Sequence, residues 1–223
     1  MDNFDIMAKL ISSLVNWLNP VRTETAATTA KQHERNMERL SNLNRLGIVF
    51  VNTFMDFCKA VPELATKFCN VPGASSHHHN WKHGLLEHSI QLALGFLNTN
   101  LKLTKLTMTD CCLMAIFHDL CKIDTYRINE DGSIGVDSDV YPHHGTRSWT
   151  LAQEVAAKMG ITLDEKFKAA ILFHMAAGWM NQEDIDAYGP TISTQLLPII
   201  GSIQAADNEA TKIMPDEFRP NLD

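Results

Sequence analysis

The sequence lacks the features of a secreted or membrane protein. No run of apolar residues approaches the about 20 that are needed to span a bilayer, and the N-terminus has no basic stretch of the kind that opens a signal peptide. The five cysteines include no CxxC pair, and their odd number does not suit a disulfide framework. We therefore expect a protein of the reducing cytoplasm that makes no contact with a membrane.

An excess of basic residues is also missing. The chain has 19 lysines and arginines against 26 aspartates and glutamates, which gives a formal net charge of −7. Because non-specific binding to nucleic acid is mostly phosphate neutralisation, this balance argues against a protein that grips a long DNA or RNA. The net charge does not reveal a local cationic pocket, and it does not include the charge of a bound metal ion. The charge favours a small substrate or the end of a strand.

Helical periodicity is present over most of the 223 residues, and the content of hydrophobic residues, 45%, is ordinary for a globular protein. Thr107 and Asp110 form a capping-box pattern at the start of one predicted helix. Residues of β-forming type surround a turn at 130–132 and predict a hairpin over 126–136. The prediction is an all-α fold with one small hairpin and with helices over 4–18, 33–67 (interrupted at Pro62), 84–97, 111–121, 148–158, 164–177, 182–188 and 194–211.

Composition divides the chain into three parts. Residues 1–30 combine an amphipathic helix, which we expect to form an N-terminal arm, with a linker rich in threonine and alanine. Residues 31–215 hold the helical core, and residues 216–223 form a C-terminal tail. The apolar face of the arm is expected to pack on its own chain or on a second subunit, and in the second case it would mediate homo-oligomerization.

Two short strings contain most of the histidines: HHHNWKHGLLEH over residues 77–88 and FHDLCK over residues 117–122. In the second string, His118 and Asp119 follow an apolar run that should be buried. Burying a carboxylate there is costly unless it is paired or coordinated, and a divalent cation would compensate. Lys122 lies on the same helical face as His118 and could neutralise Asp119 or contact a phosphate.

The order His88, His118-Asp119, Asp207 is similar to that of the HD-domain metal-dependent phosphohydrolases. The minimal ligand set of that family is a histidine, a His-Asp pair and a distal aspartate. The similarity covers residues 77–211, and the string HDLCK is its most distinctive part. The string HHHNWKHGLLEHS also resembles the start of the HD domain in bacterial 3′-5′ exoribonucleases and in HD-type conjugative relaxases. The resemblance implies an HD-domain helical bundle with these four residues as metal ligands.

Members with two metal ions add histidines between the His-Asp pair and the last aspartate, and His144 and His174 occupy those positions. His144 is preferred to its neighbour His143 because a small residue, Ser148, follows four positions later, as the family tends to have. The later position often holds two adjacent histidines in the family, whereas Met175 follows here. The resemblance thus implies one or two ions. Without the resemblance, His174 would be interpreted as a core residue, because it lies in an apolar segment.

Mixed imidazole and carboxylate ligands suit Mn²⁺, Fe²⁺, Co²⁺, Ni²⁺ or Zn²⁺ better than Ca²⁺. With two ions, Asp119 is the natural bridge, and a metal-activated hydroxide would attack phosphorus while Lys122 stabilises the developing charge. The expected activity is that of a nucleotidase or phosphodiesterase, which cleaves a phosphoester or phosphodiester bond in a nucleotide or a nucleic-acid end. Candidates for substrate contact are His78, His79, His83, Lys122 and Arg147.

These substrate contacts have simpler alternatives, and so does the function. The histidines could belong to a polar loop over the site, and Arg147 could form a surface ion pair. The chain could also be a catalytically silent HD module that binds a nucleotide or acts as a scaffold. The absence of a second histidine after His174 favours this alternative. The triple histidine suggests a third function, a DNA-processing, relaxase-like protein of a mobile element, although the acidic composition speaks against it.

Overall fold

The computed structural model describes residues 2–18, 30–99, 101–139, 143–175, 180, 182–212, 214 and 219–222. These residues form helices almost throughout, and their only sheet is a two-stranded antiparallel ribbon. The all-α fold with a small hairpin is therefore confirmed. The α-helices are α1 (Asn3–Leu18), α2 (Ala30–Ala60), α3 (Pro62–Asn70), α4 (Gly84–Gly95), α5 (Leu101–Thr104), α6 (Met108–Phe117), α7 (Lys122–Thr125), α8 (His144–Met159), α9 (Glu165–Leu172), α10 (Gln182–Tyr188) and α11 (Leu197–Ala210).

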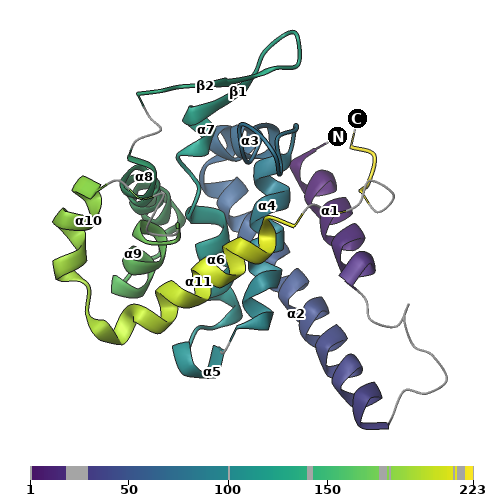
Figure 1. The fold of residues 1–223 in the computed structure, drawn as a ribbon. Coiled ribbons are helices and arrows are strands. Elements are labelled where there is room, and N and C mark those ends of the chain that lie inside the picture. The colour runs from purple at the N-terminus through teal and green to yellow at the C-terminus, as the bar shows by residue number, and fades with distance from the viewer. Residues whose placement is uncertain are drawn as a thin grey trace.

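Helix α4 lies at the centre of the molecule, and every one of its residues is buried. Figure 1 shows α11 crossing in front of it, with α1 and α2 on one side and α8 to α10 on the other. Short 3-10 turns extend the main helices at Phe96–Asn98, Gly189–Thr191 and Thr194–Leu196. The other elements therefore pack around α4 on all sides, including its polar residues Glu87, His88 and Gln91.

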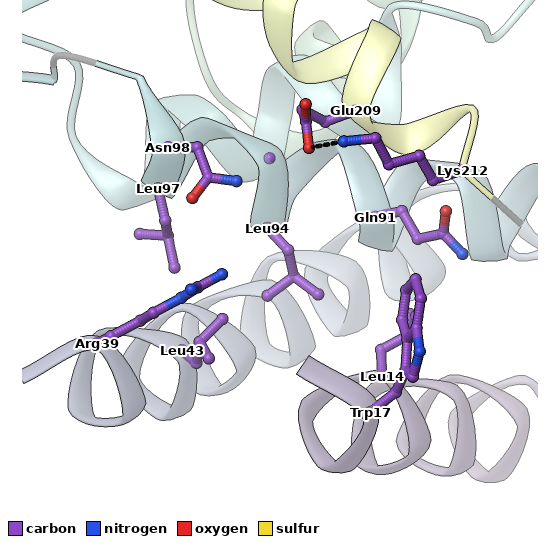
Figure 2. A pocket seen from close by; sticks show the side chains of 11 residues that line it. Leu14, Trp17, Arg39, Leu43, Gln91, Leu94, Leu97, Asn98, Glu209 and Lys212 are labelled. Atoms are coloured by element: carbon purple, nitrogen blue, oxygen red, sulfur yellow. Dashed lines mark hydrogen bonds and ion pairs between the residues drawn. The ribbon is translucent and has the colours of Figure 1, made fainter. Parts of the chain in front are cut away.

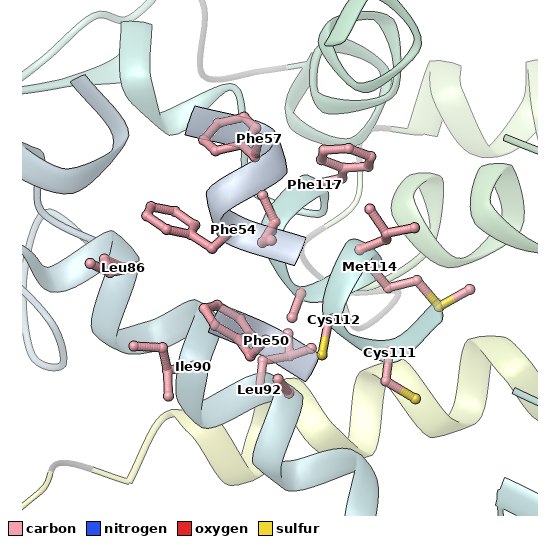
Figure 3. Packing of buried hydrophobic residues seen from close by; sticks show 14 of the residues in the cluster. Phe50, Phe54, Phe57, Leu86, Ile90, Leu92, Cys111, Cys112, Met114 and Phe117 are labelled. Carbon is pink, nitrogen blue, oxygen red and sulfur yellow. The ribbon is translucent and has the colours of Figure 1, made fainter. Parts of the chain in front are cut away.

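The main hydrophobic core is built on one face of α2. The rings of Phe50, Phe54 and Phe57 succeed one another along it, with centroids 6.2 and 5.6 Å apart. Figure 3 shows them facing Phe117 of α6 and Leu86 of α4. All five side chains are at most 1% exposed. This face follows the period of about 3.5 residues in the sequence, and the helix stops at Ala60 because Pro62 begins α3.

The N-terminal helix packs on its own chain. Met7, Leu10 and Leu14 of α1 are fully buried against α2, α3 and α4. Figure 2 shows Leu14 and Trp17 beside a hollow that is also lined by Leu43 of α2 and Leu94 of α4. Most of the apolar face of the arm is thus covered within its own chain, which is one of the two predicted arrangements, although Phe4 is 46% exposed.

The hairpin prediction is also confirmed. Strand β1 (Tyr126–Ile128) pairs antiparallel with β2 (Ile134–Val136), in the register Arg127 opposite Gly135. Gly132 in the turn has a φ of 81°, which glycine adopts without strain. In the described part of the chain, no helix has the length and apolar character of a membrane span.

Two predicted helices are shorter than their sequence patterns suggest. The helix expected over 111–121 is α6, which ends at Phe117, and the helix expected over 164–177 is α9, which ends at Leu172. The end predicted for the second helix, near residue 177, falls outside the described residues. His118 and His174 consequently lie just beyond the ends of these helices. The chain can turn at these positions, which directs their side chains inward.

Two glycines allow helices to approach closely where the polar residues gather. A Cβ atom at Gly95, at the end of α4, would lie 2.8 Å from the carbonyl oxygen of Ala206 in α11. A Cβ atom at Gly145 in α8 would lie 2.6 Å from the carbonyl oxygen of Leu172 in α9. Since backbone atoms cannot move aside cheaply, both positions require glycine, and Gly95 brings Asp207 of α11 close to α4.

We predict that Gly95→Ala destabilises the protein by about 1–3 kcal/mol, because the added methyl group meets backbone and forces α4 and α11 apart. Gly201→Ala in α11 is the matched control, since no atom lies within 4 Å of its Cβ position. There the same change should stabilise the helix by about 0.5–1 kcal/mol. Urea unfolding of both variants measures the difference, and equal stabilities would contradict this account of the crossing.

Candidate metal centre

Six polar residues from five parts of the fold meet in the core. His88 comes from α4, His118 and Asp119 follow α6, His144 begins α8, His174 follows α9 and Asp207 belongs to α11. The side chains of all but Asp207 are at most 8% exposed, and Asp207 is 23% exposed. The structure therefore brings together all six residues that the sequence predicted as metal ligands.

Local structure explains how the central pair reaches this place. Helix α6 begins at the predicted capping box, in which Thr107 accepts from the Asp110 backbone and Asp110 accepts from the Thr107 backbone. Its apolar residues fix it in the core up to Phe117. The chain then leaves the helix in a tight turn, in which the Lys122 backbone N–H donates to the Asp119 carbonyl at 2.9 Å. This turn directs His118, Asp119 and Lys122 toward the same point.

One oxygen of Asp119 belongs to a first group of ligands. Asp119 Oδ2 lies 3.0 Å from His118 Nε2 and 3.4 Å from His88 Nε2. The same nitrogen of His88 lies 3.1 Å from His118 Nε2 and 3.0 Å from Asp207 Oδ1. Two imidazole nitrogens and two carboxylate oxygens thus surround one point, as the ligands of a divalent ion do.

The other oxygen of Asp119 faces a second group. Asp119 Oδ1 lies 2.5 Å from His144 Nε2 and 3.4 Å from His174 Nε2. The two imidazole rings have centroids 5.1 Å apart. The ligand atoms of His88, His118 and Asp119 lie within 4.8 Å of one another, and so do those of Asp119, His144 and His174. Asp119 therefore stands between two sites, as a bridging carboxylate does in a centre of two ions.

The outer nitrogens of the rings fix which nitrogen faces the centre. His118 Nδ1 donates to the Ala115 carbonyl at 2.9 Å, and His174 Nδ1 donates to the Ile171 carbonyl at 2.8 Å. His144 Nδ1 lies 3.0 Å from the sulfur of Cys121. With the proton on Nδ1, the rings of His118 and His174 direct the lone pair of Nε2 toward the centre, which is the tautomer that binds a metal ion.

The protonation states suit a cation. Burial alone would raise the pKa of Asp119, but His118, Lys122 and His144 hold it well below its usual range. Burial lowers the pKa of His144 to about 4 and also lowers the pKa of His118. Burial opposes the charged form of His88 as well, yet its hydrogen bonds to Asp119 and Asp207 raise its pKa. Near neutral pH the centre therefore offers an ionised carboxylate beside the neutral imidazoles of His118 and His144.

Lys122 neutralises part of the charge and ties the centre to a neighbouring loop. Its ammonium lies 2.6 Å from Asp119 Oδ2 and donates to the Gly73 carbonyl at 2.5 Å. Burial would lower the pKa of Lys122, but Asp119 outweighs burial and raises it. Of the two roles predicted for this lysine, neutralising Asp119 is visible in the structure. We call residues 71–83, which contain Gly73, the histidine loop.

The predicted substrate contacts lie at different places. His78 is half-buried with its ring 6.0 Å from that of His88, and His79 is fully buried at 5.1 Å from the same ring. His83 Nδ1 donates a hydrogen bond to the Cys69 carbonyl. Arg147 forms an ion pair of 3.1 Å with Asp124 at the surface, which is the alternative that the sequence offered for it.

The choice between the two adjacent histidines is clear in the geometry. His144 lies in the centre, whereas His143 is exposed and lies 3.8 Å from Asp184. The contact between Cys121 and His144 was not predicted, because the sequence pattern indicates only a buried apolar residue at Cys121. Burial raises the pKa of this thiol to about 12, so it contacts His144 as a neutral group. Its place within HDLCK was the only available signal.

Comparisons of the chain with protein-family models, with curated proteins and with solved structures found no match. The donor set of the site, imidazole nitrogens and carboxylate oxygens from separate parts of the fold, fits a divalent transition metal. Buried carboxylate and facing lone pairs are unfavourable without a cation, and one lysine supplies only part of the compensation.

We predict that His144→Ala weakens the binding of one ion at least about tenfold, because it removes a ligand nitrogen from the Oδ1 side of Asp119. His143→Ala is the matched control, since it deletes the same side chain one residue away at the surface, and should leave binding unchanged. Calorimetric titration with Mn²⁺ or Co²⁺ compares the two. Equal affinities in both variants would contradict the assignment of His144.

We predict that removal of metal lowers the melting temperature. An ion that binds only the folded state and is present at a hundred times its Kd stabilises that state by about 2.7 kcal/mol. For a chain of this size the loss corresponds to a fall in Tm of about 5–10 °C. Differential scanning calorimetry before and after chelation, and after return of a single metal, measures the effect. A Tm that ignores chelation would contradict the assignment.

Proposed function

We propose that the protein is a metal-dependent phosphohydrolase that cleaves a phosphoester or phosphodiester bond in a nucleotide or at the end of a nucleic acid. The observation that carries the proposal is the position of Asp119, whose two oxygens face two separate groups of ligands. Two ions held about 3.5–4 Å apart by a bridging carboxylate are typical of enzymes that hydrolyse phosphate esters.

The residues that would hold the two ions follow from the distances. His88, His118 and Asp207 would bind the first ion together with Asp119, and His144 and His174 would bind the second together with the same carboxylate. Mn²⁺, Fe²⁺, Co²⁺, Ni²⁺ and Zn²⁺ all accept such mixed ligands. When bound, the ions would supply an activated water and would neutralise charge on the phosphate oxygens.

The remaining groups of the chain support this chemistry. Lys122 keeps Asp119 ionised and fixes it by a contact of 2.6 Å, and it also stands close to where phosphate charge would develop. Asp207 is the most exposed of the ligands, so the centre opens on its side. His78, half-buried beside His88, stands near the first ion site, where it could contact a substrate. Lys122 and His78 would thus be the groups of the chain that contact the phosphate.

The substrate class follows from charge. The net charge of −7 does not favour binding along a polyanion, whereas the cations of the centre would attract a single phosphate group. A mononucleotide, a cyclic dinucleotide and a strand end all present such a group. The active-site chemistry is the same for each, and a hydrolysis panel separates them.

We predict that Asp119→Asn lowers hydrolysis at least about 100-fold, since the neutral amide cannot bridge two cations. Asp124→Asn is the matched control: it makes the same change five positions away, at a carboxylate that pairs with Arg147 at the surface, and should retain activity. The assay is a panel of mononucleotides, cyclic dinucleotides and RNA and DNA ends with Mn²⁺, Co²⁺ or Ni²⁺.

The control variant makes the result specific to the centre. Activity that survives Asp119→Asn would refute the proposed mechanism. Tight nucleotide binding without turnover in the wild-type protein would favour the silent module instead. Nicking of single-stranded DNA with covalent attachment would favour the relaxase-like function.

A further inference from the structure

A third group of imidazoles lies against His88, in addition to the two groups that meet at Asp119. His78, His79 and His88 each offer one ring nitrogen, and these three atoms lie within 4.8 Å of one another. The ring centroid of His79 lies 5.1 Å from that of His88 and 5.4 Å from that of His78. No carboxylate belongs to this group, which distinguishes it from the two groups at Asp119.

The histidine loop is held firmly in this arrangement. The Gly73 backbone N–H donates to the His79 carbonyl at 2.8 Å, while the Gly73 carbonyl accepts from Lys122. Trp81 donates to Glu87 of α4 at 3.1 Å, and the guanidinium of Arg219 lies 4.0 Å from the centre of the Trp81 ring. The loop is thus anchored on both sides of His79.

The backbone of the loop is unusual. The φ angles of His77, His79 and His83 are 69°, 53° and 69°. These values lie in the left-handed region, which residues other than glycine rarely adopt. Such conformations persist only where surrounding structure imposes them, and they cluster at binding sites. In this loop they accompany the full burial of the His79 side chain.

Two buried nitrogens of this group have no hydrogen-bond partner. They are His88 Nδ1 and His79 Nε2. His118 and His174 donate their outer N–H groups to backbone carbonyls, so His88 is the exception among the ligands. The Gln91 side chain also interacts with the His79 ring, and its amide donates to Glu87 at 3.1 Å.

The ring nitrogens of the loop are arranged as ligand atoms would be. His79 Nδ1 lies 3.1 Å from His78 Nδ1, so the two rings already face each other. Three histidines with a fourth position left open are the ligand set of many zinc sites.

We propose that His78, His79 and Nδ1 of His88 bind a further divalent cation of the zinc type. His88 would then bind one ion through Nε2 and another through Nδ1, and it would release its ring proton to solvent. Because His78 is only half-buried, the fourth position is open to water or to a phosphate oxygen. The site goes beyond the proposed function, since it uses neither Asp119 nor Asp207.

The ligand chemistry gives the site a selectivity that the two sites at Asp119 lack. A set of nitrogens alone suits Zn²⁺ and Co²⁺, whereas Mn²⁺ prefers sites that contain oxygen ligands. The protein should therefore bind one more Zn²⁺ than Mn²⁺ per chain. Removal of a loop histidine should abolish that difference and leave the Mn²⁺ count unchanged.

The experiment counts ions per chain by elemental analysis after equilibrium dialysis of the full-length, untagged protein against Zn²⁺ or Mn²⁺. We expect His78→Ala to weaken the binding of one Zn²⁺ ion by about tenfold or more, and His79→Ala to abolish the binding of that ion. His77→Ala is the matched control, because His77 is an exposed histidine of the same loop, and it should behave as wild type. His78→Ala is decisive even if His79→Ala disturbs the buried loop.

The outcomes separate this inference from the proposed function. A Zn²⁺ count that is the same in His78→Ala as in wild type overturns the further site. Loss of one Zn²⁺ in His78→Ala supports it, whatever the result for phosphate hydrolysis. Conversely, ions that disappear in Asp119→Asn but not in His78→Ala support the centre at Asp119 and refute the site in the loop.

Discussion

The interaction on which the rest of this structure depends is the compensation of one buried carboxylate. Asp119 is ionised in the core, with His88, His118 and Lys122 around one oxygen and His144 and His174 around the other. An isolated carboxylate there would cost several kcal/mol. Five parts of the fold, namely α4, α8, α11 and the segments that follow α6 and α9, thus bring a polar group to one point, and α1, α2 and α3 supply the apolar packing around them.

The apolar packing serves this arrangement. Phenylalanines of α2 hold α6 in place up to the residue before His118, and Gly95 lets α11 come close enough to α4 for Asp207 to reach His88. Lys122 connects the carboxylate to the histidine loop through Gly73. A stable hydrophobic frame therefore positions polar groups that would be unstable alone, which is the usual relation between scaffold and site.

Much of this could be predicted from the sequence, because periodicity and residue order are local properties. The helical pattern predicted the fold class, and the resemblance carried by the order His88, His118-Asp119, Asp207 predicted residues that do meet in the core. The ends of α6 and α9, the contact of Cys121 with His144 and the burial of His79 were not predictable, since they depend on which helices pack together. The resemblance to HD-domain phosphohydrolases remains a prediction, which the geometry of the centre supports.

The most direct test of the central claim is to locate bound ions by anomalous X-ray scattering from crystals grown with Mn²⁺ or Co²⁺. The account predicts two peaks about 3.5–4 Å apart, one on each side of the Asp119 carboxylate. One peak should lie among His88, His118 and Asp207, and the other beside His144 and His174. A density map without a peak at Asp119, in crystals that hold the metal elsewhere, would contradict it.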